Sequence, residues 1–226
     1  KITADIGDNT KIRAYEVLVK AYGLESAYAE AISGGGGIIS GSRTEAKTEN
    51  KNNTTASVGE VQIDVVAFDL LAEHKLDYNS LAGIDLDISV LGRSGAAEAY
   101  NNVNTTVLAK VGKNAKITAN DILIRANNYT SKEWLSDDQH NAYSGSGSAI
   151  DLATAKSETF ITQKSLIEIL DEAILRLLSD PFYPGDINLA AYNEILARDR
   201  VKLTNGAAIT SVLAESHIEA TVDTEV

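Results

Sequence analysis

The sequence predicts an all-β protein built as a parallel β-helix, a solenoid in which coils of about 20–30 residues stack on one another. Three observations lead to this prediction. A phrase recurs about every 52 residues, apolar and polar side chains alternate within it, and aromatic residues make up only 6% of a chain rich in small and branched aliphatics. One stretch departs from this pattern and predicts an α-helical hairpin inserted between coils.

The repeat is clearest between residues 5–22 and residues 110–127, which align without a gap at an offset of 105. A third copy lies midway, at residues 56–73, and glycine-rich stretches recur more loosely at residues 33–49 and 144–160. Equivalent positions of a solenoid stack in columns and favour similar side chains, so we expect a unit of about 52 residues that contains two coils. An antiparallel sandwich or barrel would also use many short strands, but it has no reason to repeat at this spacing.

Period-two alternation of apolar residues in the segment 116–126 is typical of a strand with one buried face. The alternation changes phase at residues 120–121, which predicts a corner between two short strands. The asparagine- and threonine-rich runs at 52–55 and 102–106 predict turns in which polar side chains stack in ladders. The glycine run at 34–37 predicts a tight corner and not a phosphate-binding loop, because a strand-like pattern and no helix follows it.

The run from Lys164 to Arg200 predicts two helices. Its first apolar residues are spaced as on one helix face: Leu166, Ile169, Leu170, Ala173, Ile174 and Leu177. Asp180–Pro181 is expected to end the first helix, and Asp186 to cap a second helix that reaches Ala197. The solenoid is therefore expected over residues 1–163 and again over residues 201–226.

The composition restricts the classes of partner. The net charge of −12 and the pI of about 4.7 argue against nucleic acid and anionic membrane as partners. Cysteine is absent, which excludes disulfides and thiolate chemistry, and no apolar stretch is long enough to insert into a membrane. Methionine is absent even at position 1, so we expect the chain to be a fragment, a processed product or the interior of a longer precursor.

The sequence contains no catalytic motif, and we predict that the protein is not an enzyme and needs no cofactor. The hydrolase motif GxSxG and the phosphate-binding motif GxxxxGK[ST] are both absent. The three histidines, His74, His140 and His217, occupy unrelated contexts without metal-ligand spacing, and we expect all three on the surface.

A calcium site is a minor alternative. Asp85 and Asp87 alternate on one face of a predicted strand, and Asp64 and Asp151 could be placed similarly on adjacent strands. Stacked carboxylates repel one another unless a cation lies between them, which makes Ca²⁺ a candidate ligand. An exposed acidic strand face without metal is the favoured interpretation.

Aromatic residues in two polar stretches are the candidate interaction residues. Tyr129, Trp134 and Tyr143 lie in a predicted loop between coils, and Phe182 and Tyr183 lie in the connection of the predicted hairpin. Insertions on a solenoid often carry binding surfaces. The alternative is that these aromatic side chains cover the side of the solenoid.

The phrases at residues 110–128 and 33–59 resemble those of giant, repetitive bacterial surface and secreted proteins. These are the filamentous-haemagglutinin-like adhesins and the leukotoxin-like repeat proteins of Gram-negative bacteria. The resemblance covers residues 1–163 and 201–226 but not the predicted hairpin. It implies a right-handed parallel β-helix that forms rods or fibres outside the cell, with repeats that serve as scaffold and no catalytic residues.

From this resemblance we expect a non-enzymatic structural or adhesive segment of an extracellular bacterial rod, at the cell surface. The expected partner is the protein itself, by end-to-end stacking or as part of a longer chain, with host or cell-surface glycans and proteins as further candidates. The alternative function is a carbohydrate-binding or carbohydrate-cleaving β-helix module.

Overall fold

The computed structural model of the chain is all-β and contains no helix in the part that it describes, which is every residue except 85–87, 133–134, 137–138, 147, 179–183 and 206. All strand pairs are parallel. Sheet A contains β1 (Ile2–Ile6), β4 (Gly36–Val58), β7 (Ile88–Val111), β11 (Ile150–Ile169) and β15 (Ile209–Glu225). Sheet B contains β2 (Thr10–Arg13), β5 (Val61–Asp64), β8 (Lys116–Ala119) and β12 (Ile174–Leu177). Sheet C contains β3 (Glu16–Ser33), β6 (Ala67–Ile84), β9 (Asp121–Lys132), β10 (Ala142–Ser146), β13 (Ile187–Leu196) and β14 (Val201–Asn205).

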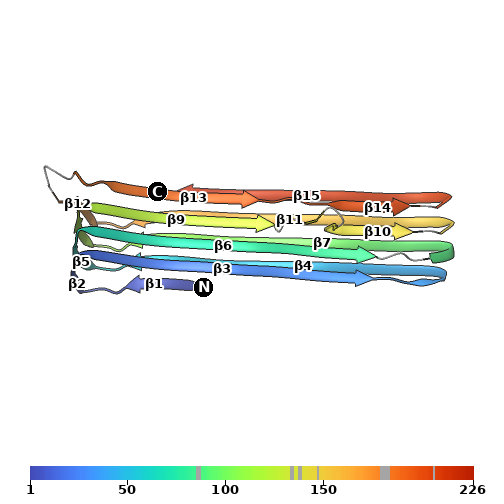
Figure 1. The fold of residues 1–226 in the computed structure, drawn as a ribbon, viewed down its shortest axis with the longest axis horizontal. Coiled ribbons are helices and arrows are strands. Elements are labelled where there is room, and N and C mark those ends of the chain that lie inside the picture. Colours follow the sequence, from blue (N-terminus) through green and yellow to red (C-terminus); the bar gives the residue numbers. More distant parts are fainter. Residues whose placement is uncertain (85–87, 133–134, 137–138, 147, 179–183, 206) are drawn as a thin grey trace.

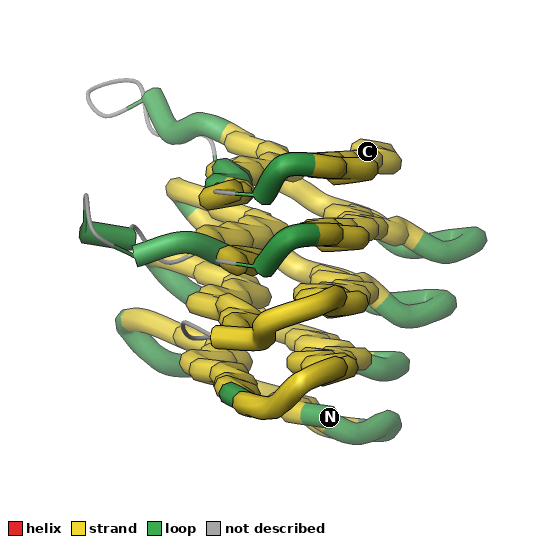
Figure 2. Tube along the Cα trace, turned by 90° about the vertical axis from the view of Figure 1, so that its right-hand side faces the viewer, coloured by secondary structure: helices red, strands yellow, loops and turns green. Residues whose placement is uncertain are grey.

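Each turn of the chain runs through sheets A, B and C in that order and then returns to sheet A. Figure 1 shows the long strands of sheets A and C side by side, the short strands of sheet B at one end, and the turns stacked from the N-terminus to the C-terminus. Figure 2 shows the same stack seen along the strands. This arrangement is consistent with a parallel β-helix or solenoid.

One sequence repeat corresponds to one full turn of the chain. Ile6 pairs with Val58, Val58 with Val111 and Val111 with Ile169, at sequence separations of 52, 53 and 58. The expectation that each repeat contains two short coils was therefore wrong. The strands of sheets A and C reach 18 to 24 residues, so stretches that suggested separate short strands belong to single long ones.

The predicted corners are confirmed. Strand β8 ends at Ala119 and β9 begins at Asp121, so the change of phase at Asn120 marks the passage from sheet B to sheet C. Gly34 and Gly35 connect β3 to β4, as expected for a glycine-rich corner. At both points the polypeptide changes direction. Around Asn120 the buried positions on either side, Ala119 and Ile122, are apolar.

The predicted helical hairpin is wrong. Residues 164–169 complete β11, β12 pairs with β8, and β13 pairs with β9, so this segment is a further turn of the stack. The helix-like spacing arises because two alternating strands meet at a turn over residues 170–173, where the phase of the alternation changes. Backbone pairing with the preceding turn outweighs the helical pattern, as tertiary context often does.

The short connection from sheet A to sheet B contains a residue in the left-handed conformation in three of the four circuits of the chain. Asn9, Asn114 and Glu172 have φ values of 60°, 59° and 62°. Asparagine tolerates this conformation well, whereas for other side chains it costs roughly 1 kcal/mol. Glu172 therefore occupies a position that favours asparagine or glycine, which is one reason why the sequence did not reveal this copy of the repeat.

The apolar core has two unequal ends. The larger cluster lies beside sheet B and contains branched and aromatic residues such as Ile63, Phe68, Leu70, Ile117 and Ile124. At the other end of the long strands the core narrows to a cluster made mostly of alanine: Ala46, Ala82, Ile84, Ala97, Ala99, Ala142 and Ala155. Small side chains there indicate that sheets A and C pack closely at that end.

The middle of the core contains polar side chains beside a small apolar cluster of Leu76, Tyr78, Val103 and Ile161. The asparagine- and threonine-rich runs lie within strands β4 and β7 and not at turns, which corrects the prediction for them. Their alternate residues point inward, so Thr54 and Thr105 are buried, as is Asn101 just before the second run. The predicted stacking of polar side chains does occur, but inside the molecule, where each such group needs a hydrogen-bond partner.

Candidate functional site

The most distinctive site is a buried ion pair between two turns of the chain. Lys132 is the last residue of β9, and Asp199 lies in the connection between β13 and β14. The Lys132 ammonium contacts the Asp199 carboxylate, and their side chains are 0% and 1% exposed. Alternation explains how a lysine comes to lie inside, because every second residue of β9 from Ile122 to Lys132 is buried.

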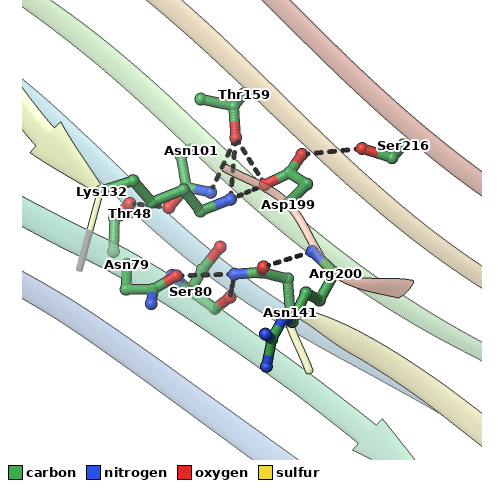
Figure 3. A network of polar contacts seen from close by, with 10 residues as sticks. All are labelled: Thr48, Asn79, Ser80, Asn101, Lys132, Asn141, Thr159, Asp199, Arg200 and Ser216. Atoms are coloured by element: carbon green, nitrogen blue, oxygen red, sulfur yellow. Dashed lines mark hydrogen bonds and ion pairs between the residues drawn. The ribbon is translucent and has the colours of Figure 1, made fainter. Parts of the chain in front are cut away.

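A ladder of hydrogen bonds leads through three turns to this pair (Figure 3). Thr48, Asn101 and Thr159 are paired neighbours in β4, β7 and β11. Thr48 Oγ1 donates to Asn101 Oδ1 at 2.7 Å, and Asn101 Nδ2 donates to Thr159 Oγ1 at 3.2 Å. Lys132 Nζ also donates to Thr159 Oγ1 at 3.1 Å. Thr159 Oγ1 in turn donates to Asp199 Oδ1 at 3.5 Å.

The second oxygen of Asp199 faces the last turn. Ser216 in β15 donates its hydroxyl to Asp199 Oδ2 at 3.3 Å. Ser216 is exposed, whereas Thr159 is fully buried. The carboxylate therefore has one oxygen directed into the core and one at the border with solvent.

The side chain of Asn141 links neighbouring turns of the chain by hydrogen bonds at the point where the pairing of sheet C is interrupted. Its Nδ2 donates to Asn79 Oδ1 at 2.7 Å and to the Ser80 carbonyl at 3.2 Å, and its Oδ1 accepts from the Arg200 backbone amide at 2.9 Å (Figure 3). These bonds join three successive turns where β9 has ended and β10 has not yet begun. The ion pair therefore lies beside a break in the sheet that side chains bridge.

Burial controls the charge state of the lysine. It lowers the pKa of Lys132 to about 7, because an ammonium ion loses its hydration inside the protein. The adjacent carboxylate of Asp199 acts in the opposite direction and favours the charged form. A neutral amine at Lys132 is therefore accessible near pH 7, and transfer of its proton to the contacting oxygen of Asp199 would give a neutral amine next to a carboxylic acid.

A second polar cluster lies one turn lower, around His74. His74 is 1% exposed, so the expectation that all three histidines lie on the surface was wrong. Neither of its ring nitrogens has a hydrogen-bond partner among the described residues, and the Glu25 carboxylate lies 3.8 Å from Nε2. Glu25 instead accepts from the side-chain amides of Asn50 and Asn52. Burial lowers the pKa of His74, and the charge of Glu25 partly opposes this.

The lowered pKa of His74 predicts loss of stability in acid. Below about pH 6.5, the usual histidine pKa, the unfolded chain binds a proton that the folded chain resists binding. The free energy of unfolding should therefore be highest above this pH and fall below it, by up to about 1.4 kcal/mol per pH unit. Urea unfolding between about pH 5 and pH 8 measures this slope.

His74→Asn should make that pH profile flatter, because asparagine does not titrate and Asn128 is its paired neighbour in the next turn. His217→Asn is the matched control, because the side chain of His217 is 50% exposed. An unchanged slope in His74→Asn would contradict the assignment to His74.

The structure places two of the five predicted interaction residues. Tyr129 lies on the outer face of β9, where its ring centroid is 5.7 Å from that of Tyr192 and 5.3 Å from Lys75 Nζ. Tyr143 lies on β10, with its ring against Gly83 of β6. The two tyrosines lie on different strands of sheet C. Trp134, Phe182 and Tyr183 fall outside the described residues, and so do the two calcium candidates, Asp85 and Asp87.

A surface hollow adjoins Tyr143. It has a volume of about 440 Å³ and is lined by Gly83, Tyr143 and Gly145, with Glu30 and Lys202 among the charged residues around it. A Cβ on Gly83 would lie 2.2 Å from the ring of Tyr143, so glycine at residue 83 leaves the room that this ring occupies. The hollow therefore adjoins a ring whose position requires glycine on the neighbouring strand.

The described residues contain no cluster of three or more metal-binding side chains. Asp64 is in sheet B, 4.0 Å from Arg13, and Asp151 is in sheet A, so the expectation that they lie on adjacent strands was wrong. In the described part of the chain, no helix is long and apolar enough to cross a membrane.

Sequence reasoning missed Lys132 and Asp199, but part of the signal was present. Continuing the alternation of residues 122–126 to Lys132 places that lysine inside, and the repeat aligns Thr48 with Asn101. Asp199 lies in an irregular connection, and no periodicity places it.

Comparison with known proteins adds no relative: no protein-family model, no curated protein and no solved structure matches this chain.

Proposed function

We propose that the chain is a right-handed parallel β-helix that acts as a non-enzymatic structural or adhesive segment of an extracellular bacterial rod or fibre. The single observation that supports this most strongly is that β13, β14 and β15 at one end of the stack repeat β3 and β4 at the other end in register. A stack of this kind can be extended at both ends by turns of the same shape. Resemblance to repetitive bacterial surface proteins supports the extracellular, cell-surface location.

The two ends of the stack have open strand edges. Strand β15 pairs with β11 on one side, and the described residues provide no strand on its other side. Its apolar side chains remain exposed: Ile209, Val212, Leu213, Ile218 and Val222. An open edge of 17 residues is a template for another parallel strand.

The register makes the two ends complementary. Following the strand pairs through three steps, β3 is related to β13 and β14, and β4 to β15, by the same shift in sequence number. Strands β1 and β2 are related to β11 and β12 by a smaller shift. The equivalent pairs include Val17 and Ile187, Ala31 and Val201, and Glu45 and Glu215. In sheet C, a second copy placed on the last turn would put Val17 over Ile187 and Ala31 over Val201. In sheet A the inward-facing columns are mixed, since Thr48 would lie over Ile218.

The proposal predicts that material from the natural source is much larger than the 24.1 kDa of this chain, because the chain continues or because copies stack. Analytical ultracentrifugation of the chain by itself distinguishes these possibilities. If copies stack, Ala214→Pro should convert the assemblies to monomers. The Ile209 amide donates to the carbonyl of Ala149, just before β11. Because amides alternate in direction along a strand, the amide of residue 214 faces the open edge. Proline at this position removes that hydrogen-bond donor.

Ala214→Ser is the matched control, since it keeps the amide and should leave the assemblies unchanged. A monomer of the wild-type chain would favour the longer chain over stacking. Monodisperse material of 24.1 kDa from the natural source would contradict the rod altogether.

A carbohydrate-binding or carbohydrate-cleaving module is the second candidate, and the hollow beside Tyr143 favours it. A tyrosine ring with flanking carboxylate and ammonium groups suits the apolar face and the hydroxyl groups of a sugar. Binding to a glycan array that is lost in Tyr143→Ala would favour this function, and release of sugar product would favour cleavage.

A further inference from the structure

The contact between Lys132 and Asp199 joins a nucleophile to an acyl group. The two side chains are almost completely buried, and Nζ contacts Oδ1 directly. Such confinement gives two reactive groups a very high effective concentration. A buried neutral amine is also a much better nucleophile than a hydrated ammonium ion.

We propose that Lys132 and Asp199 form an intramolecular amide bond that covalently links β9 to the connection between β13 and β14. The assignment rests on this contact, on the burial of both groups and on the arrangement of hydroxyl groups around them. It does not depend on the proposed rod function, because a covalent cross-link can occur in a monomer as well as in a fibre.

The reaction is a condensation without any other reactant. In the neutral pair, the lone pair of Lys132 Nζ attacks Asp199 Cγ and forms the C–N bond. One proton leaves Nζ, the bond between Cγ and Oδ1 breaks, and Oδ1 departs with two protons as water. Oδ2 remains as the amide oxygen, so that amine and acid are converted to amide and water with no change in oxidation state.

Thr159 is placed to carry the proton. Its Oγ1 lies 3.1 Å from Nζ and 3.5 Å from Oδ1, so it can accept a proton from the nitrogen and donate its own to the leaving oxygen. Asn101 Nδ2 donates to the same Oγ1, which leaves the hydroxyl proton of Thr159 to point toward Asp199. The ladder thus fixes the direction of the transfer.

Ser216 is placed to stabilise the other oxygen. Its hydroxyl donates to Oδ2, the atom that carries negative charge while Cγ is tetrahedral. The exposed position of Ser216 also places the reacting carboxyl group near solvent, where the released water can leave. Both oxygens of Asp199 therefore have a partner suited to their role.

The cross-link would lie where the backbone pairing of sheet C is interrupted. Strand β9 ends at Lys132, and its partner β13 ends at Leu196. An amide bond there would join the third and fourth turns by a covalent bond just beyond their last paired residues. A single bond at this position opposes the separation of these turns.

Intact mass spectrometry of the purified, folded wild-type chain tests the proposal. We expect a mass lower than the sequence mass by one water molecule, and a tryptic digest in which the peptides of Lys132 and Asp199 are joined. A folded wild-type chain that keeps its full sequence mass after prolonged incubation, and is cleaved by trypsin after Lys132, would overturn the proposal.

Three variants assign the chemistry. Lys132→Arg and Asp199→Ala should keep the full sequence mass, because each lacks one reacting group. Thr159→Val should slow the loss of water about a hundredfold in a time course after refolding. Thr162→Val, on the outer face of the same strand, is the matched control and should react at the wild-type rate; equal rates in both valine variants would remove Thr159 from the mechanism.

Discussion

Lys132→Met is expected to lower the free energy of unfolding by about 3–5 kcal/mol relative to the wild-type chain with its ion pair intact, before any amide bond has formed. The change leaves the Asp199 carboxylate, which is 1% exposed, without its positive partner inside the protein. The penalty comes from the uncompensated buried charge and not from lost packing, because methionine has nearly the volume of lysine. Urea or thermal unfolding followed by circular dichroism measures it.

The double variant Lys132→Met/Asp199→Leu should recover most of that loss, because it removes both charges together. Lys156→Met is the matched surface control: Lys156 Nζ lies 2.9 Å from Glu158, but both side chains are about one-third exposed. We expect little change there, since solvent screens such pairs. A loss in Lys156→Met as large as in Lys132→Met would show that burial is not the cause.

Gly112→Ala is expected to destabilise the protein by about 1–3 kcal/mol. Gly112 stacks directly on Gly59 of the preceding turn, and an added Cβ would lie 2.8 Å from the Cα and carbonyl carbon of Gly59 and from the carbonyl oxygen of Val58. These are backbone atoms that a rotamer change cannot move. The two turns would have to separate, and equilibrium unfolding in urea would report the cost.

Gly7→Ala provides a control within the same column. Gly7 follows Ile6 as Gly112 follows Val111, but a Cβ on Gly7 would meet no atom within 4 Å. We expect Gly7→Ala to change the free energy of unfolding by less than about 0.5 kcal/mol. Equal effects at both positions would argue against steric contact between the turns.

The sequence was sufficient to predict the repeat, the parallel all-β fold and the corners at Asn120 and Gly34–Gly35. These features depend on local patterns: alternation, glycine in a corner and the recurrence of one phrase. The number of residues in one turn could not be predicted from these local patterns. Alternation identifies a strand but does not say that two stretches, such as residues 25–33 and residues 16–24, belong to one strand.

The polar core and the fourth turn depend on neighbours distant in sequence. Residues 164–177 show helical spacing in isolation, and only their pairing with residues 106–119 makes them strands. Histidine and lysine are residue types that usually lie on the surface. His74 and Lys132 are nevertheless buried, because they occupy inward-facing positions of the same alternation that buries Ile124. For these residues the phase of the strand was a better guide than the chemistry of the side chain.

The near-constant length of a turn has a consequence for how such a chain can change over generations. A duplication or loss of one whole turn would leave every column of the stack aligned, whereas a shorter insertion of an odd number of residues within a strand would shift inward residues outward. The third turn indicates where a shorter insertion is tolerated. Tyr78 pairs with Lys132 at an offset of 54 and Ala82 with Ala142 at an offset of 60, so the chain contains additional residues between β9 and β10 and the register resumes in β10. A second seam lies between β12 and β13, where the offset rises from 58 at Leu177 to 65 at Ile187. The gene can thus vary in length by whole turns, or by insertions at seams such as these two.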